Sequence, residues 1–141
     1  MNAPAVFDSR DAHCKKPYGA LPCGEEWCLT CRPLSSEGFT HCSVIIRREF
    51  SGHEIEAEMP FSGFWDDRAC FSISLIPFQV PELDWYWFRF WRDDGTGCFL
   101  DKTGYRSQGE PQPWQLTVYL RSHTPQWFGE GVTYQIFPER Y

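Results

Sequence analysis

Short segments in which apolar and polar residues alternate are the feature that most constrains the fold of this chain. A period of two residues is typical of β-strands with one buried face, and the 11 prolines and 11 glycines fall mainly between such segments. No stretch shows a convincing helical periodicity. The pattern therefore predicts an all-β chain with seven strands, at Glu26 to Arg32, His41 to Arg48, His53 to Met59, Ala69 to Ile76, Trp85 to Arg92, Cys98 to Lys102 and Trp114 to Leu120.

The alternation also predicts which side chains face the core. The expected inward side chains of the second and third strands are Cys42, Val44, Ile46, Ile55, Ala57 and Met59, and Glu54, Glu56 and Glu58 are expected to face water. Seven short strands separated by turn residues are typical of an antiparallel β-sandwich of immunoglobulin-like type. We assign this sandwich to residues 1–122.

Charge and hydropathy exclude two classes of partner. The net charge is −6, and the 13 Lys and Arg residues are scattered rather than gathered in a basic stripe, which argues against nucleic-acid binding. No apolar run approaches the roughly 20 residues of a membrane span, and the first residues become charged before a signal-peptide core can form. The sequence thus predicts a cytoplasmic protein.

Seven cysteines, an odd number without an export signal, indicate reduced thiols rather than a disulfide framework. Cys28 and Cys31 have the spacing of a zinc knuckle. However, Trp27, Leu29 and Cys31 alternate with polar neighbours as in a strand, and residues three apart on a strand point to opposite faces. A second such pair is absent, so the sequence favours thiols over zinc, and no metal or cofactor is predicted.

The segment Trp85 to Trp91 is aromatic on both faces. Arginine is rarely fully buried, so the face with Arg89 is expected to point outward and to contribute little to stability. An outward stripe of this kind suits a sugar platform, a domain or subunit interface, or a surface covered by the chain's own loops. The candidate carbohydrate-binding or interface residues are Trp85, Trp87, Arg89 and Trp91.

Motifs for catalysis are missing from the sequence. The adjacent carboxylates Asp66-Asp67 and Asp93-Asp94 lie in predicted turns, where Asp is favoured because its side chain bonds to the nearby backbone. The four histidines lack metal-binding spacing, and neither a nucleophile elbow nor a phosphate-binding loop is present. The chain is therefore predicted not to be an enzyme.

Residues 123–141 follow the last predicted strand and contain a further strand-like run. This run resembles the start of the catalytic barrel in glycoside hydrolase family 13, the α-amylase family, in its neopullulanase, cyclomaltodextrinase and maltogenic-amylase members. The matching residues are Trp127, Gly129, Gly131, Tyr134, Gln135, Ile136, Phe137 and Pro138, and the family has aspartate and phenylalanine where this chain has Glu139 and Tyr141. Upstream landmarks in the family's order are Phe7 to Arg10, Lys16 to Ala20, Trp85 to Phe90 and Gln115 to Tyr119.

This resemblance implies an N-terminal sandwich followed by the first strand of a truncated (β/α)8 barrel, the TIM barrel. The parent enzyme would be a retaining α-glycosidase whose two catalytic carboxylates lie on later barrel strands. The chain itself would be a non-catalytic module that assists starch or maltodextrin binding. The alternative is a structural or dimerisation module that shapes the parent's active-site cleft without binding sugar. The expected partners are accordingly an α-glucan, the missing barrel and a second copy of the chain.

Overall fold

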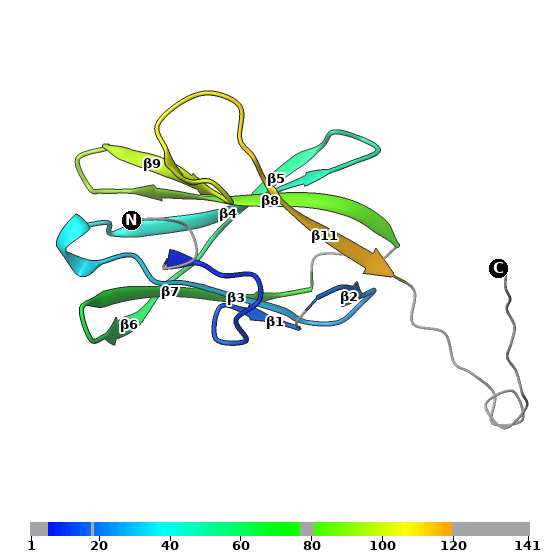
Figure 1. Ribbon diagram of the computed structural model, residues 1–141, viewed down its shortest axis with the longest axis horizontal. Coiled ribbons are helices and arrows are strands. Elements are labelled where there is room, and N and C mark those ends of the chain that lie inside the picture. Colours follow the sequence, from blue (N-terminus) through cyan, green and yellow to red (C-terminus); the bar gives the residue numbers. More distant parts are fainter. Residues whose placement is uncertain (1–5, 18, 77–80, 120–141) are drawn as a thin grey trace, which may run out of the picture.

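Two β-sheets lie face to face in the computed structural model, which describes residues 6–17, 19–76 and 81–119 (Figure 1). The four-stranded sheet has the order β1 (Lys15–Lys16), β3 (Trp27–Cys31), β7 (Arg68–Leu75) and β6 (Phe61–Trp65). The seven-stranded sheet contains β2 (Leu21–Pro22), β4 (His41–Arg48), β5 (Glu54–Glu58), β8 (Glu82–Trp91), β9 (Gly97–Asp101), β10 (Gly104–Arg106) and β11 (Trp114–Tyr119). One short 3-10 turn, η1 (Ser35–Glu37), joins the sheets between β3 and β4.

Strand β8 organises the seven-stranded sheet. It pairs with β4 along most of its length, with β11 through its first half and with β9 through its second half. Strand β5 extends the sheet beyond β4, and β10 extends it beyond β9. All these pairs are antiparallel, whereas β2 runs parallel to β11, which the sequence did not predict.

Each of the seven strands predicted from the alternation has a counterpart in the structure, so the all-β prediction is confirmed for the described residues. Four strands were missed, namely β1, β2, β6 and β10. Three of these contain two or three residues, too few to show a period. The fourth, β6, carries a bulge between Phe61 and Gly63, which breaks the alternation.

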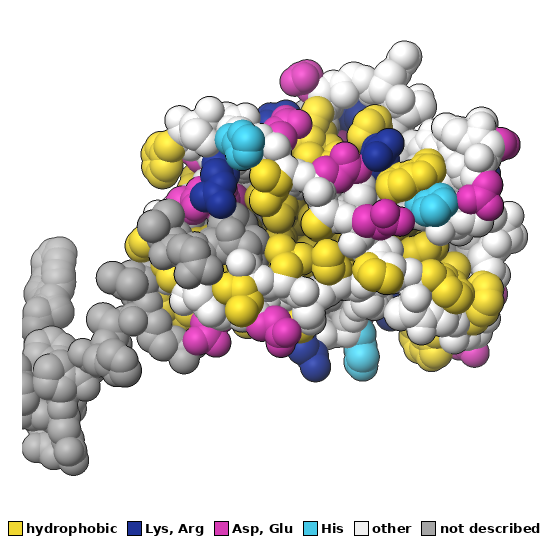
Figure 2. Space-filling model, turned by 180° about the vertical axis from the view of Figure 1, so that it is seen from behind, with side chains coloured by type: hydrophobic (Ala, Val, Ile, Leu, Met, Phe, Trp, Pro, Cys, Tyr) yellow, Lys and Arg dark blue, Asp and Glu magenta, His cyan; other side chains and the backbone are white. Residues whose placement is uncertain are grey.

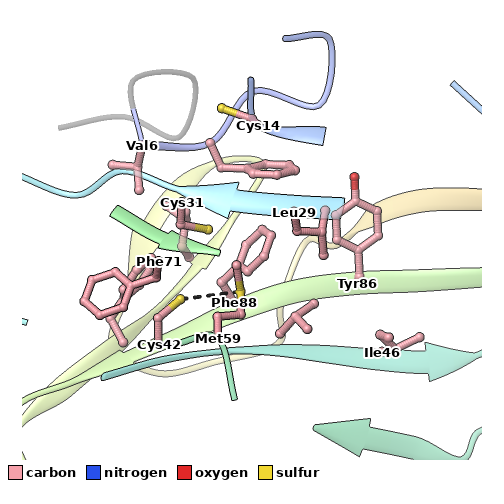
Figure 3. Packing of buried hydrophobic residues seen from close by; sticks show 14 of the residues in the cluster. Val6, Cys14, Leu29, Cys31, Cys42, Ile46, Met59, Phe71, Tyr86 and Phe88 are labelled. Atoms are coloured by element: carbon pink, nitrogen blue, oxygen red, sulfur yellow. Dashed lines mark hydrogen bonds between the residues drawn. The ribbon is translucent and has the colours of Figure 1, made fainter. Parts of the chain in front are cut away.

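The core lies between the sheets (Figure 3). From the four-stranded sheet, β3 buries Trp27, Leu29 and Cys31, the three residues expected to alternate with polar neighbours. Trp27 meets Tyr86 of β8 edge to face, with ring centroids 5.0 Å apart, so aromatic contacts join the two sheets. This packed core leaves the outer faces of the two sheets free to carry polar groups.

The predicted inward set is also confirmed. Cys42, Val44, Ile46 and Met59 are at most 1% exposed, and the Cys42 thiol points at the Met59 sulfur 3.7 Å away (Figure 3). Ile55 and Ala57 are half-buried and pack against the same core, because β5 is an outer strand. Glu54, Glu56 and Glu58 are exposed as expected.

Hydrophobic side chains also reach the surface. Figure 2 shows them gathered across the middle of one face and at one end, with acidic side chains among them. Large exposed apolar residues in the described part are Phe50, Phe61, Phe64, Trp65, Ile76 and Tyr119. Within that part, no helix has the length and apolar character needed to span a membrane. The predicted barrel strand, together with the rest of residues 120–141, lies outside the described residues.

Candidate surface groove on the seven-stranded sheet

Strand β8 separates its side chains as the sequence predicted. Tyr86, Phe88 and Phe90 are fully buried in the core. The four candidate site residues therefore lie on the outer face of the seven-stranded sheet, since neighbouring residues on a strand point to opposite faces. The faces of this strand were assigned correctly from Arg89 alone.

Cross-strand pairing places charged side chains beside this aromatic stripe. Ile45 of β4 lies between Trp87 on one side and Glu56 of β5 on the other. One step along the sheet, Arg47 occupies the same position between Trp85 and Glu54. Each row thus combines an aromatic residue of β8 with a carboxylate of β5.

The residues of these rows other than Trp85, together with Arg89 of β8, form one side of an open groove of about 440 Å³, which we call the Trp87 groove. The remaining lining comes from β9, β10 and the loop between β10 and β11. The lining residues are Ile45, Arg47, Glu54, Glu56, Trp87, Arg89, Phe99, Arg106, Gly109 and Pro111. The groove is therefore built from six segments, which reach from β4 to the loop before β11.

Trp87 is only 5% exposed, which differs from the expectation of an open stripe. The Arg47 guanidinium lies over its indole ring, 4.9 Å from the centroid. Gly109 and Pro111 of the following loop line the same groove. The Arg47 side chain thus covers this tryptophan, so Trp87 contributes packing as well as a groove wall.

The charged residues of the groove bind one another. The Nε of Arg89 donates to Glu56 Oε2 at 2.9 Å, and the Ser43 hydroxyl donates to the same oxygen. The Nε of Arg47 donates to Glu54 Oε2 at 2.9 Å. Each arginine therefore has a carboxylate partner, and the two pairs leave this part of the groove without net charge.

Trp91 lies at the other end of the stripe. Its indole stacks on the His41 ring at a centroid distance of 5.1 Å and an interplanar angle of 12°. The Arg89 guanidinium lies 4.2 Å from the Trp91 ring centroid, which links this tryptophan to the groove. The hydrogen bond between His41 and Asp93 raises the pKa of the imidazole most, and the hydrogen bond between His41 and Glu58 adds to this increase.

Trp85 points away from this arrangement, because its indole N–H donates to the Glu49 carboxylate. Of the four predicted residues, Trp87 and Arg89 share the groove, Arg89 and Trp91 are in contact, and Trp85 is separate. Phe99, Arg47, Glu54 and Glu56 were missed as groove residues. The sequence pattern predicted that the β5 glutamates point outward. It did not predict that β4 pairs with both β5 and β8 and so brings these glutamates near the β8 aromatic residues.

Two predictions about local structure are confirmed, namely the two aspartate turns and the strand alternation at Cys28 and Cys31. Asp93-Asp94 and Asp66-Asp67 lie in turns, and the Asp94 carboxylate accepts bonds from the Thr96 amide and hydroxyl at 2.9 and 2.6 Å. Cys31 is buried while Cys28 lies on the outer face, as strand alternation requires. All seven cysteines are free thiols. Among the described residues, no group of three or more His, Cys, Asp or Glu side chains could hold a metal ion.

Comparison with known proteins adds one relative. Amylopullulanase from Thermoanaerobacter thermohydrosulfuricus is 24% identical over 160 residues, covering 95% of this chain and 10% of that protein. The similarity supports a relationship to the α-amylase family. It does not extend to a particular enzyme type within that family, and no family model matches the chain. The chain spans about a tenth of the length of this curated relative.

Proposed function

We propose that this chain is a non-catalytic β-sandwich module of an α-glucan-hydrolysing glycoside hydrolase and that it assists the binding of starch or maltodextrin. The similarity to an amylopullulanase supports the α-glucan connection. The observation that carries the proposal is the Trp87 groove, in which aromatic side chains adjoin arginines and carboxylates that bind one another.

A groove of this composition suits a neutral sugar. The phenyl ring of Phe99 offers apolar contact to the C–H faces of glucose rings, and the Trp87 indole would add to it once Arg47 moves aside. Convergent polar groups fix the orientation of a ligand. Arg47, Arg89 and Arg106 are balanced by Glu54, Glu56 and Asp101, so the site has no uncompensated charge to attract an anionic or cationic ligand. Hydroxyl groups can instead share the hydrogen bonds of these ion pairs.

Catalysis is not part of the proposal. Retaining hydrolysis needs one carboxylate as nucleophile and another as acid, about 5 Å apart across the scissile bond. Here the Glu54 carboxylate binds Arg47, and the Glu56 carboxylate accepts bonds from Arg89 and Ser43. We assign hydrolysis to a (β/α)8 barrel of the parent, and the sequence resemblance assigns residues 123–141 to a linker and the start of that barrel.

We further propose an immunoglobulin-like architecture and a cytoplasmic setting for the module. The sandwich is of immunoglobulin-like type, supported by its two mainly antiparallel sheets and by a chain that passes from β3 in one sheet to β4 in the other. The module acts in the cytoplasm, in keeping with seven free thiols.

A structural or dimerisation role is the second candidate. It is favoured by the cover on Trp87, because a tryptophan that is 5% exposed offers a ligand little surface unless Arg47 moves. In this role the stripe would pack against the parent's barrel or a second copy, and the module would shape the active-site cleft without binding sugar.

Titration of the 141-residue chain with β-cyclodextrin, followed by tryptophan fluorescence, separates the two roles. Sugar binding predicts a saturable change that Arg89→Ala weakens at least tenfold, because this residue contacts both the groove and Trp91. Lys102→Ala, an exposed change outside the groove lining, is the matched control and should bind as the parent chain does. An unchanged spectrum, or equal binding by the Arg89 variant, would count against the groove.

A further inference from the structure

The outer face of the four-stranded sheet carries a second polar surface that the sequence did not indicate. Four hydroxyl residues of three neighbouring strands, Thr30, Ser62, Ser72 and Ser74, form what we call the hydroxyl ladder. The Ser72 hydroxyl lies 2.9 Å from that of Thr30 and 3.2 Å from that of Ser62, while Ser74 pairs with the Cys28 thiol at 2.9 Å. Small side chains leave this face flat and rich in donors and acceptors.

Trp65 stands at one end of the ladder. It closes β6 before the Asp66-Asp67 turn, and its side chain is 56% exposed. The Arg32 guanidinium lies 5.2 Å from its ring centroid and supports the indole from the neighbouring part of the sheet. This is a large aromatic surface held in place at the edge of a flat polar face.

A hollow of about 300 Å³ lies beside Trp65, and its lining also includes His13, Thr30, Arg32 and Cys70. The Nε of Arg32 is buried and has no hydrogen-bond partner among the described residues. Leaving a buried donor unbonded is costly, so a movement of Arg32 that brought this donor to a ligand or water oxygen in the hollow would be favoured. The Arg32 charge itself is balanced by Asp11, whose carboxylate lies 3.3 Å from Arg32 Nη2 and 3.2 Å from His13 Nδ1.

We propose that this face is a second saccharide-binding surface, in which a sugar ring stacks on Trp65 and the chain extends over the hydroxyl ladder. The inference rests on the proposed function only for the choice of an α-glucan as the saccharide. Arg32 and His13 would bond hydroxyl groups of the stacked ring, and Thr30 would do so from the adjoining strand. The local charges are balanced, so a neutral ligand is expected.

A protein partner fits this face less well. The cores of protein interfaces are enriched in aromatic residues and methionine and depleted in serine, whereas three of the four ladder residues are serines. With the Trp87 groove on the opposite sheet, two surfaces on one module would hold two chains, or two parts of one polymer, at the same time. Linking two weak sites in this way raises the apparent affinity for a polymer over that for a short oligosaccharide.

The test is a titration of the 141-residue chain, labelled with 5-fluorotryptophan, with maltoheptaose, observed by fluorine NMR. The Trp65 signal is identified by its loss in Trp65→Phe. We expect this signal to move saturably, with a dissociation constant between about 1 μM and 1 mM. The movement should persist in Arg89→Ala, which disables the groove, and require at least threefold more sugar in Thr30→Val, which removes one hydroxyl at nearly constant shape.

Two outcomes would overturn the inference. One is a Trp65 signal that stays fixed at about 10 mM sugar, well above the weakest expected dissociation constant. The other is a Trp65 signal that responds only to protein concentration, with a dimer in sedimentation that Trp65→Ala abolishes, which would make this face an interface. Movement of the Trp65 signal while the groove tryptophans stay silent would support the inference and refute the proposed groove, so the two failures are distinguishable.

Discussion

Replacement of Trp87 by alanine tests whether the outer face of β8 is a packed surface or an open platform. In the structure this residue is 5% exposed and lies under the Arg47 guanidinium, although it faces away from the core. We expect Trp87→Ala to destabilise the fold clearly. An open platform would tolerate the same change.

The expected magnitude follows from the buried area. A tryptophan side chain removes about 200 Å² from water, which at about 25 cal/mol per Å² gives roughly 5 kcal/mol as an upper value. The groove opens to solvent, and Arg47 can move over the shortened residue, so the loss should fall near the lower end of the range for such truncations, about 3 kcal/mol. For a sandwich of this size that corresponds to a fall of about 10 °C in Tm.

Urea unfolding followed by far-UV circular dichroism measures this loss directly. Trp91→Ala is the matched control, because Trp91 is only half-buried at the end of the same strand face, and it should lose about 1 kcal/mol. If Trp87→Ala lost less than about 1 kcal/mol, the packing of Arg47 over this residue would be refuted.

Three further predictions concern titration and reactivity. The pKa of His41 should lie above 6.5 in a proton NMR titration, because the imidazole bonds to Asp93 and Glu58. Its contribution to stability is therefore complete below pH 6.5 and is lost as the pH rises through the folded-state pKa. Asp93→Asn should lower that pKa, and a midpoint at or below 6.5 in the unchanged chain would contradict these hydrogen bonds. Burial raises the pKa of Asp84 from 3.8 to about 7, with a smaller contribution from the neighbouring Glu82. The folded state therefore retains a proton that the unfolded state releases, and the Asp84 carboxyl lowers the stability of the fold increasingly between pH 4 and 7. Asp84→Asn should therefore stabilise the chain more at pH 8 than at pH 4, by on the order of 1 kcal/mol in urea unfolding, and an equal effect at both values would refute this. Burial raises the pKa of the Cys31 thiol, so iodoacetamide followed by mass spectrometry should label Cys28 well before Cys31, and equal rates would show that the core opens readily.

The fold could be predicted largely from the sequence because its signal is local. Alternation in β3, β4 and β8 depends on one strand at a time, and burial on one face imposes it. Strand β6 escaped because its bulge lets Phe61 and Phe64, three residues apart, pair with Phe71 and Ala69, which both face the core. A period of two cannot describe such a strand.

The candidate sites were less accessible to sequence reasoning, since they depend on contacts between distant segments. Trp87 is covered by Arg47, 40 positions earlier, and shares its groove with Pro111, 24 positions later. The hydroxyl ladder left no signal at all, because isolated Ser and Thr residues are common on any surface. Only the pairing of β3, β7 and β6 brings these hydroxyls together.

Isothermal titration calorimetry with maltoheptaose tests the central claim most directly, because it records binding and hydrolysis in one experiment. For the 141-residue chain the account predicts a saturating isotherm with a dissociation constant between about 1 μM and 1 mM, weakened in Arg89→Ala, and no heat after saturation. Continuous heat from turnover would contradict the non-catalytic assignment. Absence of any binding heat at about 10 mM sugar would contradict the glucan-binding role itself.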